Sequence, residues 1–116
     1  MNNKYNATKT EYKGIVYDSK WEAHRAYELD MMERAGMIKD LRRQVRFILQ
    51  EDYINNRGQH IRPISYIADF VYSDKTGQKY VEDTKSPATR TAEYRIKKKI
   101  FEYRYKDYLF VESIKG

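Results

Sequence analysis

Residues 67–85 read IADFVYSDKTGQKYVEDTK, and this stretch decides the fold. Its two halves are rich in β-branched and aromatic residues and flank the turn Asp74-Lys75-Thr76-Gly77, which predicts a β-hairpin. With Gly77 in the left-handed position of a three-residue loop, Asp74 pairs with Gln78. Counting inward, this register pairs Tyr72 with Tyr80, Val71 with Val81, and Asp69 with Asp83.

Charged side chains interrupt these otherwise apolar strands. Because alternate residues of a strand share a face, Asp83 and Lys85 point one way, while Glu82 and Thr84 point the other way. The register places the Asp69 and Asp83 carboxylates opposite one another, where like charges repel unless a positive group lies between them. The alternative interpretation is a solvated face on which Lys85 pairs with one of the two aspartates.

A divalent cation would relieve the repulsion between Asp69 and Asp83. Mg²⁺ prefers a few carboxylate oxygens together with water, and Mn²⁺ accepts ligands of the same kind. A neighbouring Lys85 ammonium could position a metal-bound water or stabilise charge that develops on a phosphate. These three residues therefore match the needs of metal-dependent phosphodiester hydrolysis.

The segments around the hairpin predict a mixed sheet flanked by helices, in the α/β (α+β) class. Ser19-Lys20-Trp21-Glu22 matches the capping box Ser-x-x-Glu, and Gly36 suits a helix C-terminus, so we expect a helix between them. The expected elements are a short strand at Gly14–Tyr17, a helix at Lys20–Ala35, strands at Leu41–Gln50, His60–Tyr72 and Gln78–Lys85, a helix at Thr91–Tyr105, and a strand at Tyr108–Ser113. The second helix provides the crossover that brings the last strand in parallel to its neighbour.

The composition fits one folded domain over residues 1–116. Hydrophobic residues make up 41% of the chain and 12 residues are Tyr, which is too much apolar and aromatic content for a disordered chain. There is no Cys and there are two His, which excludes disulfides, thiolate chemistry and a His-based zinc site. Without a long apolar run or a signal-peptide stretch, we expect a soluble cytoplasmic protein and no membrane partner.

The formal net charge of +6 favours a polyanionic partner such as nucleic acid, although the same charge serves solubility in small domains. Candidates for contacts to DNA phosphates lie in or near the second helix and in the first long strand: Arg90, Arg95, Lys97, Lys98, Arg42 and Arg43. Two apolar stripes also run along the second helix. We expect both stripes to be buried, one made of Ile96, Ile100 and Tyr103 and the other of Tyr94, Phe101 and Tyr105.

These elements resemble the PD-(D/E)XK nuclease superfamily, and in particular a small phage or prophage branch that is similar to Holliday junction resolvases. That superfamily has a helix bearing a Glu, a strand with an Asp, a strand with (Asp or Glu)-x-Lys, and then a helix and a further strand. Glu22, Asp69 and Asp83-Thr84-Lys85 match these positions in order, over almost the whole chain. Ala68 replaces the Pro of the pattern at a position that is not catalytic. The resemblance implies a restriction-endonuclease-like core.

The resemblance also implies a catalytic set, which is Glu22, Asp69, Asp83 and Lys85. In it, the three acidic residues ligate Mg²⁺ or Mn²⁺, and Lys85 positions the attacking water. Glu22 has a second interpretation, in which it completes the capping box and is purely structural. Thr91 and Lys97 are accessory candidates, because related nucleases often place a residue of this helix near the metal.

The implied function is a metal-dependent DNA endonuclease that leaves a 5′-phosphate. Structure-specific cleavage of branched DNA or a junction, or nicking, is the preferred activity within this class, and cutting both strands implies a homodimer. The alternative is a catalytically inactive nuclease-fold subunit that binds nucleic acid in a phage replication, recombination or packaging assembly. A third interpretation is a protein-binding domain whose charges serve solubility.

Overall fold

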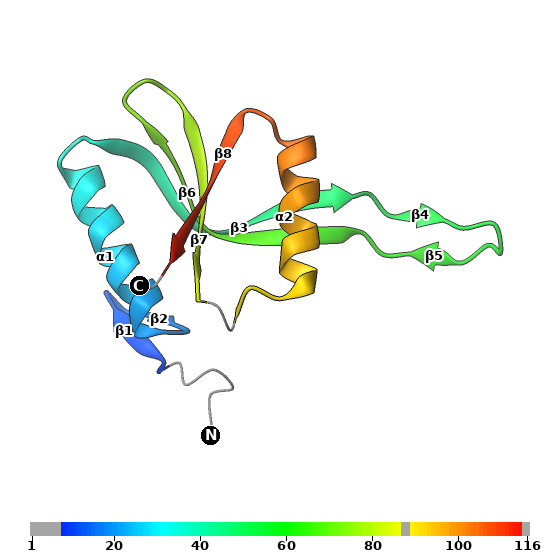
Figure 1. The fold of residues 1–116 in the computed structure, drawn as a ribbon, viewed down its shortest axis with the longest axis horizontal. Helices are drawn as coiled ribbons and strands as arrows, with labels where there is room; N and C mark the ends of the chain where they lie inside the picture. The colour runs from blue at the N-terminus through cyan, green and yellow to red at the C-terminus, as the bar shows by residue number, and fades with distance from the viewer. Residues whose placement is uncertain (1–7, 87–88, 115–116) are drawn as a thin grey trace.

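The computed structural model describes residues 8–86 and 89–114 (Figure 1). The elements are β1 (Thr10–Tyr12), β2 (Ile15–Tyr17), α1 (Lys20–Arg34), β3 (Ile38–Gln50), β4 (Tyr53–Ile54), β5 (His60–Ile61), β6 (Ile64–Asp74), β7 (Lys79–Lys85), α2 (Ala92–Arg104) and β8 (Tyr108–Ile114). In the described part of the chain, no helix is long and apolar enough to cross a membrane.

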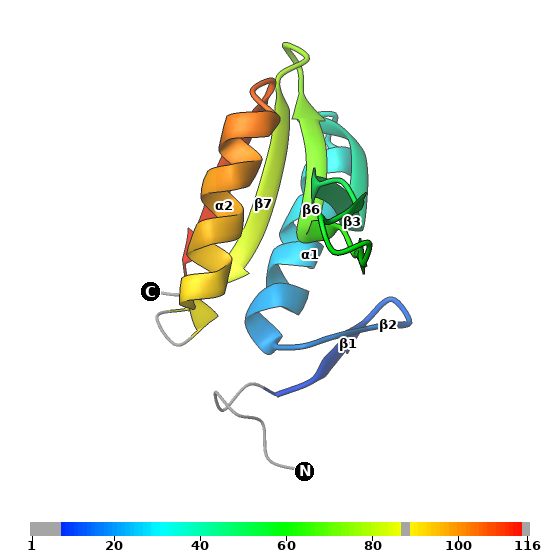
Figure 2. The same ribbon diagram turned by 90° about the vertical axis from the view of Figure 1, so that its right-hand side faces the viewer.

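A four-stranded sheet with the order β3-β6-β7-β8 forms the centre of the molecule. β3, β6 and β7 are antiparallel neighbours, and β8 lies parallel to β7 because α2 crosses over between them. The two helices lie on opposite faces of this sheet (Figure 2). The predicted α/β (α+β) class, with a mixed sheet flanked by helices, is therefore confirmed.

Consecutive residues of β6 supply both halves of the core. Val71 belongs to the apolar cluster on the α2 face, together with Val81 and Phe101. Phe70 belongs to the cluster on the α1 face, where it joins Leu29. Each helix thus covers one face of the sheet by burying apolar side chains, which is the main stabilising contribution to such a layered fold.

The predicted hairpin register is confirmed where the ladder is continuous. Tyr72 pairs with Tyr80 and Val71 pairs with Val81. At the turn, the Asp74 amide donates to the Gln78 carbonyl at 3.0 Å, and Gly77 has a φ of 91°. That left-handed backbone favours glycine, because glycine has no Cβ to clash there. Away from the turn, the last pair of the ladder is Phe70 with Glu82. Asp69 and Asp83 are the next residues, at the open end of the hairpin.

The sequence correctly predicts both helices to within one residue at each end. α1 begins after Ser19, whose hydroxyl oxygen accepts from the Glu22 amide at 3.1 Å. α2 begins after Thr91, whose hydroxyl oxygen accepts from the Tyr94 amide at 3.1 Å. Each bond satisfies one of the amides that a helix start leaves without a partner.

The predicted strand at His60–Tyr72 is divided in the structure. β5 ends at Ile61, and β6 begins at Ile64 after Pro63, which lacks the amide that a continuous ladder needs. β5 pairs with β4, which the sequence analysis did not predict, and together they form the end of an arm that extends from the body of the molecule (Figure 1). β1, which pairs with β2, was also not predicted.

The expected packing of α2 is wrong for one of its two apolar stripes. Ile96 is 58% exposed and Tyr103 is 75% exposed, whereas Tyr94 and Phe101 are buried. The helix docks through its aromatic side, where the Phe101 ring contacts the rings of Phe47 and Tyr105 at centroid distances of 5.0 Å. Both stripes have helical spacing, so periodicity alone could not tell which of them the sheet would cover.

Candidate active site

A cavity of about 340 Å³ lies where β6 and β7 meet the first turns of α2. Predicted site residues from three elements line it, namely Asp69, Asp83, Lys85, Thr91 and Lys97. The cavity walls also include Tyr66 and Tyr94. The hairpin and α2 therefore bring five of the predicted catalytic and accessory residues together.

The pairing of β3 with β6 is interrupted at Gln44 and Asp69. Among the described residues, the β3–β6 ladder passes from Arg43–Phe70 to Val45–Ala68 without a pair between Gln44 and Asp69. Gln44 has a φ of 53°, a left-handed conformation that is uncommon for a residue with a side chain. Ala68 lies on the α2 face and Phe70 on the α1 face, so the strict alternation of β6 breaks at Asp69.

The Asp69 and Asp83 carboxylates each bond to the backbone of the opposite strand. Asp83 Oδ1 accepts from the Asp69 amide at 2.9 Å. Asp69 Oδ2 accepts from the amide and the hydroxyl of Thr84, at 2.9 Å and 3.0 Å. These reciprocal bonds hold the two carboxylates at the end of the hairpin, next to one another as the register predicts.

Asp83 does not lie on a solvated face. It is 2% exposed, and burial together with the charge of Asp69 raises the pKa of Asp83 to about 6. Lys85 lowers this pKa in part, because its Nζ lies 3.7 Å from Asp83 Oδ2. The Lys85 ammonium is 4.3 Å from the centre of the Tyr94 ring, which holds it at the cavity wall.

Glu22 lies on α1 and does not line this cavity, although its charge interacts with that of Asp69. It is 6% exposed, and burial, followed by the charges of Asp69 and Asp18, raises the pKa of Glu22 to about 7. The Ser19 half of the capping box forms, but in the described chain the Glu22 carboxylate makes no hydrogen bond to the Ser19 amide. A backbone hydrogen bond at Asp18 instead lowers the pKa of Glu22 in part, so Glu22 does not form the predicted reciprocal cap with Ser19.

A divalent cation at this site would have two neighbouring carboxylates as its hard oxygen ligands. Among the described residues, no group of three or more His, Cys, Asp and Glu side chains is arranged to hold a metal ion. Mg²⁺, however, is usually bound through one or two carboxylates and keeps several waters. The neighbouring Asp69 and Asp83 carboxylates supply that number of hard oxygen ligands, and burial together with the charge of Asp69 raises the pKa of Asp83, an effect that a bound cation would oppose. The pair therefore fits Mg²⁺ or Mn²⁺.

The chain matches one protein-family model over residues 2–115, described as Protein of unknown function (DUF1064). The chain belongs to the DUF1064 family. No curated protein and no solved structure matches it. The family description names no activity. Asp69, Asp83, Glu22 and Lys85 therefore take their candidate roles from the geometry of this DUF1064 chain alone.

The basic residues predicted to bind DNA divide into two groups in this DUF1064 protein. Lys97 lines the cavity and pairs with Glu93 at 3.2 Å, and Arg43 lies near enough to Glu22 to lower its pKa. Arg90 pairs with Glu112 at 3.4 Å. Of the six predicted residues, all of which the structure describes, Lys97 alone is in the lining of this cavity. Arg42 is exposed on β3, Arg95 is exposed on α2, and Lys98 pairs with Glu102.

A buried ion pair beside the site was missed by sequence reasoning. Glu82 is fully buried, and it accepts from Arg25 Nε at 2.5 Å and from Arg25 Nη2 at 3.0 Å. Tyr72 and Ser113 also donate to it. Burial alone would raise the pKa of Glu82, but these bonds outweigh it and lower the pKa. The pair joins α1 to β7 and so fixes Glu22 relative to Asp83.

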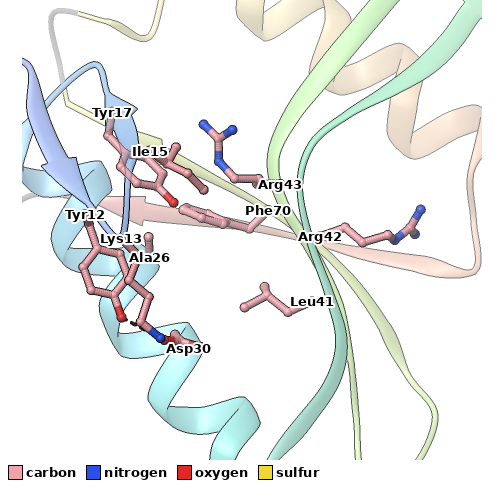
Figure 3. Close-up of a pocket in the computed structure, with 10 residues that line it drawn as sticks. All are labelled: Tyr12, Lys13, Ile15, Tyr17, Ala26, Asp30, Leu41, Arg42, Arg43 and Phe70. Atoms are coloured by element: carbon pink, nitrogen blue, oxygen red, sulfur yellow. Dashed lines mark hydrogen bonds and ion pairs between the residues drawn. The ribbon is translucent and has the colours of Figure 1, made fainter.

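A second cavity, of about 190 Å³, lies between the β1–β2 hairpin, α1 and β3 (Figure 3). Its lining is mostly apolar and aromatic, and its acidic residue, Asp30, already accepts from Tyr12 and Lys13. Figure 3 shows Arg43 pointing toward Tyr17, while Arg42 points away from that ring. This cavity lacks the paired carboxylates of the DUF1064 site on the other face.

The raised pKa values of Glu22 and Asp83 make stability depend on pH. In the unfolded chain these groups lose their protons near pH 4.5 and pH 3.8, whereas in the folded chain they do so near pH 7 and pH 6. Between these limits the folded state binds more protons, so the free energy of unfolding falls as the pH rises from about 4 to about 7.

Glu22→Gln should therefore stabilise the metal-free protein at pH 8, by on the order of 1–3 kcal/mol, and should have little effect at pH 4. Denaturant unfolding in EDTA at the two pH values measures this difference. The matched control is Glu51→Gln at an exposed position, for which we expect no such change. A Glu22→Gln protein that is less stable than wild type at pH 8 would contradict the placement of Glu22 among repelling carboxylates.

Proposed function

We propose that this protein is a metal-dependent endonuclease that hydrolyses phosphodiester bonds in DNA. The observation that carries the proposal is the buried Asp83 carboxylate beside the half-buried Asp69, with Lys85 Nζ 3.7 Å from Asp83 Oδ2. Burial and neighbouring charge raise the pKa of Asp83, and carboxylates perturbed in this way are concentrated at functional sites. The proposed ligands of Mg²⁺ or Mn²⁺ are Asp69 and Asp83, supported by Glu22.

The bound metal would supply Lewis-acid stabilisation of the phosphate and a water of lowered pKa. Asp69 Oδ1, which now accepts from Gln44 Nε2 at 3.5 Å, and Asp83 Oδ2, which now faces Lys85 Nζ at 3.7 Å, would hold it. The bonds from Thr84 and from the Asp69 amide would keep both carboxylates oriented. Lys85, fixed against Tyr94, would orient the attacking water and neutralise charge on the phosphate. Lys97 at the cavity wall and Arg90 near α2 would bind backbone phosphates.

The proposed substrate is branched DNA or a junction, with nicking of duplex DNA as the simpler activity, and the proposed product carries a 5′-phosphate. A single site cuts one strand at a time, so paired cuts would need a homodimer with two sites. The proposed location is the cytoplasm of the host cell. These points extend the nuclease resemblance, and the net charge of +6 supports a DNA partner.

The second candidate is a nuclease-fold subunit that binds nucleic acid without cutting it. It is favoured by the absence of a three-residue metal group among the described residues, and by the backbone bonds that both carboxylates already make. In that case the Asp69 and Asp83 carboxylates would serve only to join β6 and β7 through their hydrogen bonds to the opposite backbone. The fold and the basic residues would serve binding alone.

Incubation with supercoiled plasmid and with a four-way junction, in Mg²⁺ or in EDTA, tests the proposal. We expect cleavage of at least one substrate in Mg²⁺ and none in EDTA. If neither DNA is cut in Mg²⁺, the enzyme proposal is rejected. Binding whose log affinity falls linearly with log salt would then favour the second candidate, because Lys and Arg contacts to phosphates release counterions.

A further inference from the structure

The Tyr66 hydroxyl lies buried at the cavity and makes no hydrogen bond of normal length in the described part of the chain, although the Asp83 carboxylate is close enough to contribute to its raised pKa. Tyr66 is 5% exposed, so ordinary solvent does not reach most of its surface. Leaving a buried hydroxyl without a partner costs about 1–3 kcal/mol, and such groups are few in folded proteins. The group therefore requires an explanation.

The position of this hydroxyl is fixed by the core. The Tyr66 ring packs against Phe101 and Phe110, at centroid distances of 5.7 Å and 5.8 Å. Other tyrosines of the same core have partners: Tyr94 donates to Glu112 at 2.6 Å, and Tyr105 donates to the Ile48 carbonyl at 2.7 Å. Tyr66 thus differs from its neighbours, and its ring cannot swing away to satisfy the hydroxyl without disturbing the packing.

The cavity around Tyr66 is suited to an anionic oxygen. Burial and the nearby charge of Asp83 raise the pKa of Tyr66, so the hydroxyl keeps its proton and can donate it in a hydrogen bond. Lys85 and Lys97 line the same cavity and supply positive charge. The Tyr66 hydroxyl and the Lys85 and Lys97 ammonium groups are all hydrogen-bond donors in this cavity. A phosphate suits them, because its non-bridging oxygens accept hydrogen bonds and carry negative charge.

We propose that the Tyr66 hydroxyl binds a non-bridging phosphate oxygen of the substrate, in the cavity that Asp83, Lys85 and Lys97 also line. This inference rests on the proposed function, because it assigns the phosphate of that same site. The ligand class is a nucleotide phosphate, bound when a divalent cation balances the Asp69–Asp83 pair. Tyr66 accordingly acts as a substrate-binding residue, whose unpartnered hydroxyl makes the free protein less stable than it would otherwise be.

The test compares wild type with Tyr66→Phe, using thymidine 5′-monophosphate and thymidine as probes in Mg²⁺. Neither probe contains a phosphodiester bond, the bond that the proposed activity cleaves, so calorimetry reports binding alone. A hydrogen bond to a charged group contributes enough binding energy that Tyr66→Phe should lower the affinity for the monophosphate by about tenfold or more. Thymidine, which lacks the phosphate, should not distinguish the two proteins. Thermal unfolding of Tyr66→Phe should occur at the same temperature as wild type or higher.

Tyr105→Phe is the matched control, because it deletes a hydroxyl that has a partner and lies outside the cavity lining. It should lower the unfolding temperature and leave monophosphate binding unchanged. The inference is overturned if wild type does not prefer the monophosphate, if Tyr66→Phe binds it as wild type does, or if Tyr66→Phe loses as much stability as Tyr105→Phe. Cleavage of plasmid by wild type together with any of these results would reject the Tyr66 assignment and leave the proposed function standing.

Discussion

Asp83→Asn should abolish Mg²⁺-dependent DNA cleavage while leaving DNA binding intact. The amide oxygen of Asn can still accept from the Asp69 amide, which Asp83 Oδ1 now does at 2.9 Å, so the end of the hairpin should keep its shape. The change removes the negative charge that the proposed metal requires. We expect a loss of roughly 10³-fold or more in the cleavage rate, as for removal of a group that acts in the transition state.

Two assays on the same DNA measure this effect: the nicking rate of supercoiled plasmid, and fluorescence anisotropy for binding. Asp107→Asn is the matched control, because Asp107 is an exposed aspartate that pairs with Lys79 at 3.5 Å, far along the sheet from the carboxylate pair. It should cleave at the wild-type rate. An Asp83→Asn protein that also cleaves at that rate would show that the carboxylate pair is not the catalytic centre.

Arg25→Met should cause the largest loss of stability of any change considered. It would leave Glu82 charged and fully buried without its cation, because Arg25 donates two hydrogen bonds to that carboxylate. Breaking a buried pair in this way costs about 3–5 kcal/mol. In a domain of this size the melting temperature should fall by roughly 10 °C or more.

The comparison for this variant is Glu28→Ala, which removes the other partner of Arg25, at 3.1 Å on the surface of α1. Surface pairs contribute at most about 1 kcal/mol, so Glu28→Ala should be close to wild type. The double variant Arg25→Met/Glu82→Leu should recover much of the loss, since no unpaired charge remains. Equal stability of Arg25→Met and Glu28→Ala would contradict a structural role for the pair.

Local signals account for most of the fold that the sequence predicts correctly. The turn Asp74-Lys75-Thr76-Gly77 sets the hairpin register, and the N-caps Ser19 and Thr91 set where the two helices begin. These features depend on residues a few positions apart, so a single sequence contains them. The choice between the two apolar stripes of α2 depends on the sheet beneath it, and there the prediction for Ile96 and Tyr103 is wrong.

In the candidate site, too, the local features were predicted from the sequence, and the contacts between distant segments were not. Asp69, Asp83 and Lys85 lie together because strand alternation and register are local properties. For Glu22 the sequence left a cap and the site as alternatives; in the fold Glu22 is buried on α1, outside the cavity lining but close enough for the charge of Asp69 to raise its pKa. The Arg25–Glu82 pair joins residues 57 positions apart. Such a contact depends on how α1 packs on β7, which the sequence pattern alone does not determine.

Titration of the purified protein with Mn²⁺, followed by calorimetry and by thermal unfolding, tests the central claim most directly, because it requires no knowledge of the preferred DNA. The account predicts saturable binding by wild type, a rise in melting temperature equivalent to about 2.7 kcal/mol at a hundredfold excess over Kd, and loss of both in Asp83→Asn. Equal stabilisation of wild type and Asp83→Asn, or no binding at millimolar Mn²⁺, would contradict a metal centre at Asp69 and Asp83.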